Sequence, residues 1–338
     1  MLFRIPRRTL AFMLPALGLA AALTVLAPQA HAAQTLRIAS NFPSDHTASQ
    51  AMTLFKTEVE QATKGELKIA LFPDMQLGGA MENVDQVRSG TIFASVSSIA
   101  YYTRIVPEFE AVSLPFLFDS RTAAFRVMDG EAGKLLDQKM AEKGFIVLGT
   151  GELGFRHATN NVRPLASVKD FAGLKFRLQP NEVHLATFKA LGANPVSMDV
   201  KEVYSALQQG VLDGQENPYN IIATRRFSEV QKYLSDTAHF FDYINVVANK
   251  RQFERLPADQ QQAVRDAMAK AMQWQRAEAE KLDTHWREQL IKGGMQFTEI
   301  TPETREELRK ATASVVDLLR TRVDPKFVDL VVAEGTAK

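Results

Sequence analysis

The stretch TLRIASNFPSDHTASQAMTLFKTEVEQATKGELKIALF, residues 35–72, has the pattern of an α/β protein. Apolar side chains alternate over residues 36–40 and again over 67–71, which is the period of a strand, and they recur at helical spacing over residues 52–62 between the two. A second helix and a third strand follow within residues 80–97. This β-α-β-α-β order predicts a parallel sheet with covering helices.

A second α/β region begins near Phe155. The expected elements are strands over residues 174–178, 237–249 and 295–300, and helices over residues 182–191, 200–209, 258–292 and 302–321. At about 1.5 Å per residue the helix over 258–292 is about 50 Å long, which exceeds the width of one small domain. We therefore expect two lobes that are joined by crossing strands and spanned by this helix, with a cleft between them. The predicted boundaries are residues 33–154 with about 243–282 for lobe I, and residues 155–242 with about 283–338 for lobe II.

The first 32 residues have the composition of a signal peptide. Three arginines among the first eight residues precede an apolar run over residues 10–27, and small residues follow up to Ala32. This order predicts export, with cleavage after Ala32 or Ala33. A transmembrane anchor is the alternative, because the apolar run approaches the length that spans a bilayer. The Arg7-Arg8 pair leaves the twin-arginine route open beside ordinary secretion, which we favour.

Composition excludes several classes of protein. The chain has 338 residues, of which 46% are apolar, and it contains no cysteine, so a disulfide scaffold, a thiolate metal site and a cysteine nucleophile are excluded. The net charge is +1 and no basic tract occurs, which argues against nucleic-acid binding. Removal of residues 1–32 takes away three arginines and no acidic residue, which leaves 37 basic and 39 acidic residues in 306, a net charge of −2.

The motifs that would indicate catalysis or a cofactor are out of context or missing. Residues 149–154 match G-x-G-x-x-G, but a turn-rich segment over residues 155–161 follows in place of the helix that a dinucleotide site requires. We therefore interpret these glycines as a crossing between the lobes. The six histidines lack metal-ligand spacing, and the sequence contains no H-E-x-x-H, G-x-S-x-G or Walker motif. We predict no cofactor, no metal site and no catalytic residue.

One arginine and one polar cluster remain to be explained. Arg177 lies in the otherwise apolar expected strand over residues 174–178, where a buried cation needs an anionic partner. That partner is either an internal carboxylate or a bound ligand, and the residues alone leave both readings open. Residues 213–220, DGQENPYN, are polar between apolar segments, so they form either a cleft edge or a polar turn.

Several motifs resemble the DctP-like solute-binding proteins of TRAP transporters. They are FRHATN at 155–160, LGANPV at 191–196, EVYSALQQGVLDGQENP at 202–218, QLGG at 76–79, VPEF at 106–109 and LPFLF at 114–118. The resemblance covers nearly all of the chain that follows the predicted signal peptide, and the motifs occur in the family's order.

The resemblance implies a two-lobe periplasmic binding protein of the type II-like fold. Members of the family bind a small carboxylate, such as a C4-dicarboxylate or a sugar acid, close over it by hinge motion and deliver it to an ion-driven membrane permease. For this chain the resemblance implies a periplasmic monomer with an organic-acid ligand and TRAP permease subunits as partners, without enzyme activity.

The resemblance also implies which residues bind the ligand. Arg177 matches the family's strand arginine, which forms a paired contact with the ligand carboxylate, as the planar guanidinium allows. Asn217 matches the asparagine that completes this contact, and Arg156 matches a second cation at the cleft. Three further positions match residues that contact the rest of the ligand or lie in the cleft: Asn181, Glu82 and His239.

The chain departs from the family pattern at one position. The family often has an aromatic residue two positions after the methionine of residues 197–198, and this chain has Val200 there, preceded by Asp199. We expect a smaller cleft wall with a nearby charge, and aromatic surface from Tyr219 instead.

Two other functions remain as alternatives. The first is an exported enzyme that acts on an organic acid, with Glu82 or His239 as an acid–base group. The second is a binding protein that reports to a sensor kinase in place of a permease.

Overall fold

Nine strands form one mixed sheet in the computed structural model, which describes residues 1–2 and 33–337. The strands are β1 (Gln34–Ser40), β2 (Leu67–Phe72), β3 (Ala94–Ser98), β4 (Phe145–Asn160), β5 (Lys175–Leu178), β6 (Asn194–Ser197), β7 (Gly214–Asn217), β8 (Tyr233–Asn249) and β9 (Gln296–Thr298). Their order is β2-β1-β3-β8-β4-β7-β5-β6, and β9 pairs with β8. The α/β class expected from the sequence is confirmed. Apart from its first two residues, the predicted signal peptide lies outside the described residues.

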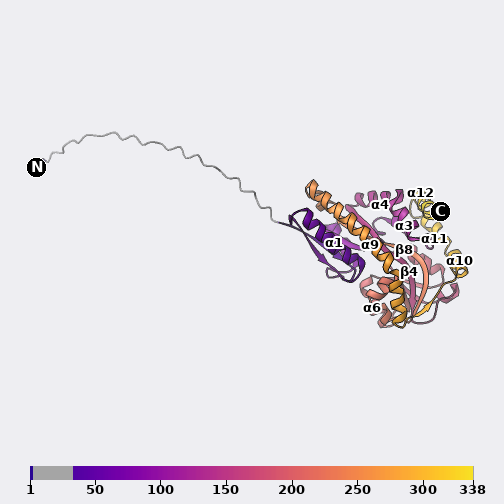
Figure 1. The fold of residues 1–338 in the computed structure, drawn as a ribbon. Helices are drawn as coiled ribbons and strands as arrows, with labels where there is room; N and C mark the ends of the chain where they lie inside the picture. Colours follow the sequence, from indigo (N-terminus) through magenta and orange to yellow (C-terminus); the bar gives the residue numbers. More distant parts are fainter. Residues whose placement is uncertain (3–32, 338) are drawn as a thin grey trace. The chain divides into compact units, whose positions relative to one another are not determined.

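Helices cover both faces of this sheet (Figure 1). The α-helices of the described residues are α1 (Thr47–Ala62), α2 (Ala80–Ser89), α3 (Arg121–Asp129), α4 (Glu131–Glu142), α5 (Glu182–Ala190), α6 (Val200–Gln208), α7 (Tyr219–Thr224), α8 (Lys250–Glu254), α9 (Ala258–Lys292), α10 (Pro302–Ala311), α11 (Ser314–Arg320) and α12 (Pro325–Thr336). A 3-10 helix over Ile99–Tyr102 directly follows β3.

The two long central strands join the two ends of the sheet. β4 and β8 are antiparallel and paired along their whole length, from Phe145 opposite Asn249 to Asn160 opposite Tyr233. β8 also pairs with β3, and β4 also pairs with β7. We call β1, β2, β3 and the segments that follow them the β1 end, and β5, β6, β7 with α6 and α7 the β5 end. The register of β4 against β8 shifts at three places between the two ends.

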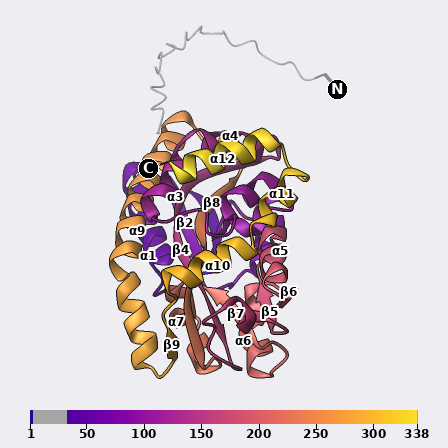
Figure 2. The same cartoon turned by 90° about the vertical axis from the view of Figure 1, so that its right-hand side faces the viewer.

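The long helix α9 has the bounds that the sequence predicts, and it extends over the whole height of the folded unit (Figure 2). It packs on α1, β4 and α7. A Cβ at Gly149 of β4 would lie 2.7 Å from Met272 Cγ of α9, and a Cβ at Gly151 would collide with Gln275. All three glycines of the G-x-G-x-x-G match therefore lie inside strand β4, and Gly149 and Gly151 allow close approach of α9.

Two local predictions are wrong. Residues 155–160 continue strand β4 rather than forming turns, because they pair with β7 on one side and β8 on the other. The predicted helix over 302–321 is two helices, α10 and α11, with a break at Thr312. The buried Thr312 hydroxyl donates to the Leu308 carbonyl at 2.9 Å, a bond from a threonine side chain to the preceding turn that bends helices.

Candidate functional site

Arg177 on β5 is a buried cation without a carboxylate partner. Its side chain is fully buried, Nε and Nη2 donate to the Met198 carbonyl at 2.9 and 2.7 Å, and Nη2 also donates to the Tyr101 hydroxyl at 3.3 Å. Within residues 33–337 Nη1 has no hydrogen-bond partner and the guanidinium forms no ion pair. A buried charge in this state is costly unless an anion joins it.

Arg177 faces a small cavity between the two ends of the sheet. The β1 end contributes Phe42 and Tyr101 to its wall, and the β5 end contributes Arg177, Asn217 and others. The space in which the centres of water-sized molecules fit is about 20 Å³, which is enough for about one water. None of the eleven lining residues is acidic. The two ends are therefore closed against each other around a positively charged site.

A second arginine, which the sequence did not indicate, lines the same cavity. Arg225 follows α7, and its side chain is only 10% exposed. It donates to the Asn41 carbonyl, and its Nη1 lies 3.6 Å from the Asp74 carboxylate, which is itself 57% exposed. Burial lowers the pKa of Arg225. The only signal in the sequence was a cation eight residues beyond Asn217.

Arg156 on β4 differs from these two because buried carboxylates neutralise it. Its Nε and Nη2 donate to Glu216 at 2.5 and 2.8 Å, and its Nη1 donates to Asp242 at 2.9 Å. Burial acts to raise the pKa of Glu216, but Arg156 and His239 together hold it well below its usual range. Arg156 Nη2 also donates to Asn217 Oδ1 at 3.0 Å. Arg156 thus reaches the cavity through Asn217, without lining it.

Asn217 is held from both sides at the end of β7. Its Oδ1 accepts from Arg156, and its Nδ2 donates to Gln215 Oε1 at 2.5 Å. Its side chain is buried and lines the cavity with Arg177. Of the residues predicted from the sequence, these two, Arg177 and Asn217, are brought together at the cavity.

The other predicted residues lie away from the cavity wall. His239 contacts Glu216 at 3.2 Å, and so belongs to the Arg156 cluster. Asn181 caps α5 through a bond from the His184 N–H at 3.1 Å. Tyr219 stacks on His157, with ring centroids 4.0 Å apart.

Glu82 and Asp199 meet at a separate surface groove. Glu82 is exposed on α2, and both residues line this groove rather than the Arg177 cavity. The Asp199 carboxylate accepts from the Lys201 N–H of α6 and from the Met81 N–H of α2, each at 3.0 Å. One carboxylate thus caps two helices, one from each end of the sheet.

The aromatic surface of the cavity comes from the β1 end. Tyr101 and Phe42 line it, and the Tyr101 hydroxyl accepts from the Val200 N–H at 3.3 Å. Val200 itself also lines the cavity. The sequence did not indicate either aromatic residue, because their approach to Val200 depends on how the two ends pack.

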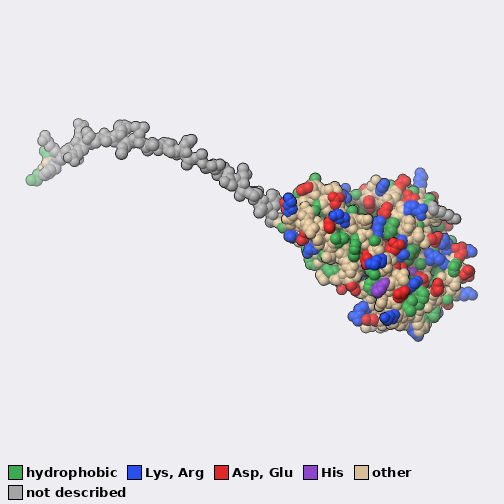
Figure 3. Space-filling view, viewed as in Figure 1, with side chains coloured by type: hydrophobic (Ala, Val, Ile, Leu, Met, Phe, Trp, Pro, Cys, Tyr) green, Lys and Arg blue, Asp and Glu red, His purple; other side chains and the backbone are tan. Residues whose placement is uncertain are grey.

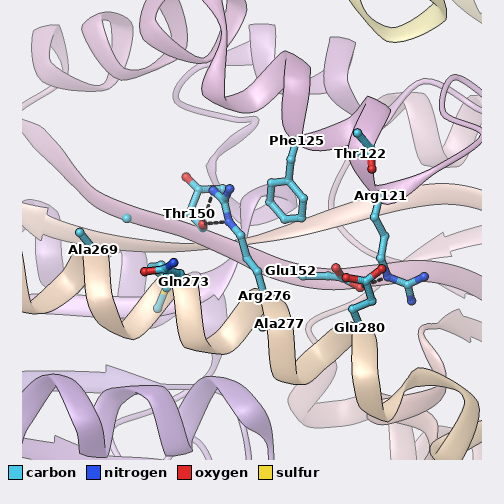
Figure 4. A pocket seen from close by; sticks show the side chains of 12 residues that line it. Arg121, Thr122, Phe125, Thr150, Glu152, Ala269, Gln273, Arg276, Ala277 and Glu280 are labelled. Atoms are coloured by element: carbon cyan, nitrogen blue, oxygen red, sulfur yellow. Dashed lines mark hydrogen bonds and ion pairs between the residues drawn. The ribbon is translucent and has the colours of Figure 1, made fainter. Parts of the chain in front are cut away.

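A larger hollow between α9, α3 and β4 has both of its arginines paired with carboxylates (Figure 4). Arg276 forms an ion pair with Asp129 at 2.7 Å and stacks over Phe125 at 3.9 Å. Arg121 lies 2.8 Å from Glu152, whose pKa burial nevertheless raises to about 7. This hollow therefore lacks the unneutralised cation that marks the Arg177 cavity.

The described residues show neither a metal cluster nor a helix that could span a membrane. No group of three or more His, Cys, Asp or Glu side chains in residues 33–337 is arranged to hold a metal ion. None of the helices within that range is long and apolar enough to cross a membrane. On the face drawn in Figure 3, acidic and basic side chains are interspersed.

The family profile described as bacterial extracellular solute-binding protein, family 7 (DctP), matches residues 38–321. The chain belongs to this family. It is 36% identical to the 2,3-diketo-L-gulonate-binding periplasmic protein YiaO of Escherichia coli strain K12 over 76% of this chain and 78% of that protein.

Solved structures of other family 7 proteins have the same fold. A TRAP periplasmic solute-binding protein of Polaromonas bound to D-erythronate is 35% identical with a TM-score of 0.86, covering 90% of this chain and 100% of that one. Another from Sulfurospirillum deleyianum with bound succinate is 31% identical with a TM-score of 0.86, covering 89% and 99%. The family resemblance and the two-lobe α/β fold inferred from the sequence are confirmed. Family 7 is a family of solute-binding proteins and not of enzymes.

Proposed function

We propose that this protein is the periplasmic binding subunit of a TRAP transporter and that Arg177 and Asn217 hold the carboxylate of its ligand. The observation that supports this is the fully buried Arg177, whose Nη1 is unpartnered within residues 33–337 beside a cavity without an acidic wall. A carboxylate there would accept two parallel hydrogen bonds from the guanidinium and supply the missing negative charge. No catalytic step is part of this function.

Ligand entry requires the two ends of the sheet to separate. The cavity has room for about one water, so a carboxylic acid cannot enter the closed form. Contacts between the ends would break on opening, among them the bond from the Thr103 hydroxyl to the Pro180 carbonyl at 2.9 Å and the bond from Arg177 Nη2 to the Tyr101 hydroxyl at 3.3 Å. We propose hinge motion of two lobes about β4 and β8, with lobe I over 33–154 and about 243–282, and lobe II over 155–242 and about 283–338.

The remaining predicted residues take indirect or outer roles in this proposal. Arg156 positions Asn217 by donating to its Oδ1, and His239 supports Arg156 through Glu216. Asn181 and Tyr219 are buried outside the cavity of the closed form, and Glu82 lies at the separate surface groove. Export through the signal peptide and delivery by a monomer to the membrane permease complete the proposed function.

The test is binding of a panel of small carboxylic acids to the protein and to Arg177→Met, measured by isothermal titration calorimetry. Removal of one partner of a buried charged pair costs about 2–5 kcal/mol, so we expect affinity to fall by about thirty-fold to several thousand-fold. Lys175→Met is the matched control, because Lys175 is an exposed cation on the same strand. Unchanged affinity in Arg177→Met would show that the carboxylate is held elsewhere.

A further inference from the structure

His46 is a buried histidine at the start of α1 that caps this helix with its ring. It is only 1% exposed, and its Nδ1 accepts a hydrogen bond from the Ala48 N–H at 3.1 Å. A ring nitrogen that accepts a hydrogen bond carries no proton, so the imidazole is neutral and its hydrogen lies on Nε2. The cap therefore exists only while His46 is unprotonated.

One face of the His46 ring supports the wall of the Arg177 cavity. The ring stacks on Phe42, with centroids 4.6 Å apart and an angle of 20° between the planes. Phe42 lines the cavity, and its carbonyl accepts from the Ser49 hydroxyl of α1 at 3.0 Å. The position of this aromatic wall thus depends on His46 and on the helix that it caps.

Groups of the β5 end face His46 across the closed interface. Arg225, which follows α7, donates to the Asn41 carbonyl, and Asn220 lies on α7 itself. Burial and the charge of Arg225 lower the pKa of His46 to about 3, whereas the Asn220 side chain acts to raise it. Within residues 33–337 neither His46 Nε2 nor Asn220 Oδ1 has a hydrogen-bond partner. A protonated His46 would add a second positive charge beside Arg225, so this interface accepts the neutral ring.

Two carboxylates of the β1 end come near this interface, and both are exposed. Asp45 directly precedes His46, and Asp74, whose side chain is 57% exposed, lies 3.6 Å from Arg225 Nη1. Water and salt screen the charges of exposed groups, which therefore interact weakly. These two residues do not supply the counter-charge that a protonated His46 would need in the closed form.

From this arrangement we propose that closure over the ligand requires neutral His46, so that binding in mildly acidic solution releases a proton from this residue. The inference rests on the proposed function and adds a positioning residue to it, because His46 does not line the cavity and acts through Phe42 and α1. Opening of the two ends moves Arg225 and α7 away from His46 and admits water to its ring.

The direction of the pH effect follows from the two forms. In the open form His46 titrates near pH 6.5, as an ordinary histidine does, and in the closed form its pKa is about 3. Because the pKa is lower in the closed form, closure is unopposed above pH 6.5 and is increasingly opposed as the pH falls below that value. Ligand affinity should therefore decrease in acid.

Isothermal titration calorimetry of the full protein at pH 8 and pH 5 tests this coupling, with succinate, D-erythronate and the other acids of the binding panel as probes. For an acid that binds at pH 8, we expect the affinity of the parent to fall by about ten-fold to thirty-fold at pH 5. At pH 6, titrations in two buffers of different ionisation enthalpy should show release of about 0.8 of a proton for each molecule bound. A residue with a purely structural role would release none.

His46→Asn is the matched variant, because asparagine is a good helix cap that does not titrate. It should lose most of the pH dependence and of the proton release, whatever its affinity at pH 8. An acid that itself titrates near pH 5 affects the parent and this variant alike. His285→Gln is the control and should behave as the parent does, because His285 is exposed on α9.

The outcomes separate this inference from the proposed function. If the parent binds an acid without pH dependence and without proton release, or if His46→Asn keeps both, the role of His46 is overturned while the carboxylate site can stand. If the parent binds none of the acids, or if Arg177→Met binds each of them as the parent does, the proposed function is overturned and the role of His46 with it. The proton release of the parent needs no variant, so the test does not depend on the folding of His46→Asn.

Discussion

Arg156 on β4 and Arg177 on β5 are equally buried, yet they meet opposite surroundings. Arg156 bonds two buried carboxylates, those of Glu216 and Asp242. Arg177 bonds a backbone carbonyl and a phenol, and keeps one nitrogen unpartnered within the described residues. Burial of a cation is therefore uninformative by itself. What distinguishes a structural arginine from one that awaits a ligand is whether the protein supplies the counter-charge.

The largest expected effect that tests this comparison is on stability. Arg156→Met leaves Glu216 and Asp242 buried without their cation, so we expect the free energy of unfolding to fall by about 3–5 kcal/mol. Arg177→Met strands no carboxylate, and without ligand we expect a change within about 1 kcal/mol in either direction. Urea denaturation of the ligand-free proteins measures both. Equal destabilisation by the two substitutions would mean that the distinction between the arginines has no energetic basis.

The part of the molecule that the sequence predicts well is the part that local signals determine. α9 has the predicted bounds because Pro257 and a long periodic pattern mark it without reference to the rest of the chain. The sequence indicates turns over residues 155–160, because nothing local marks a strand whose conformation depends on pairing with β7 and β8. The break between α10 and α11 at Thr312 coincides with one side-chain hydrogen bond, and the helical pattern of the sequence over residues 302–321 continues through it without a signal.

The same division holds for the site. Arg177 and Asn217 could be inferred because each stands in a motif whose context is visible along the chain. Arg225 and Tyr101 could not, because they enter the cavity only when α7 and the segment after β3 pack against β5. The sequence did not indicate that the Asp199 carboxylate caps both α2 and α6, because its bond to α2 depends on how the two ends of the sheet pack. The partner of a side chain is a tertiary property, and most site residues are defined by their partners.

A second, smaller effect concerns the pH dependence of stability near the two arginines. His184 is fully buried, and burial together with Arg156 and Arg177 lowers its pKa to about 3, although Glu216 acts in the opposite direction. Because the folded pKa is below the unfolded value of about 6.5, its contribution to stability is present above pH 6.5 and is lost as the pH falls toward 3. Between pH 8 and pH 5 we therefore expect the free energy of unfolding to fall by about 2 kcal/mol more in the parent protein than in His184→Leu.

Thermal or urea unfolding at pH 8 and pH 5 tests this expectation. His285→Gln is the control, because His285 is exposed on α9. A parallel drop in stability for His184→Leu and the parent would indicate that His184 is protonated in the folded protein, and that its burial lowers its pKa less than its position implies.

The smallest expected effect concerns the contact between the two ends away from the arginines. Asp199→Ala removes the cap of α6 and the bond to Met81 of α2, and a lost cap typically costs about 1 kcal/mol. Since the bond to Met81 joins the two ends, its loss disfavours the closed form, and we expect ligand affinity to fall by about five-fold.

Asp324→Ala separates the two consequences of that substitution. Asp324 caps α12 through the Lys326 N–H at 3.0 Å and lines neither the cavity nor the groove. Both variants should lose stability to a similar degree, but only Asp199→Ala should lose affinity. If the two variants bind the ligand equally well, the shared cap is an ordinary stabilising contact, and closure over the ligand depends on the arginine site alone.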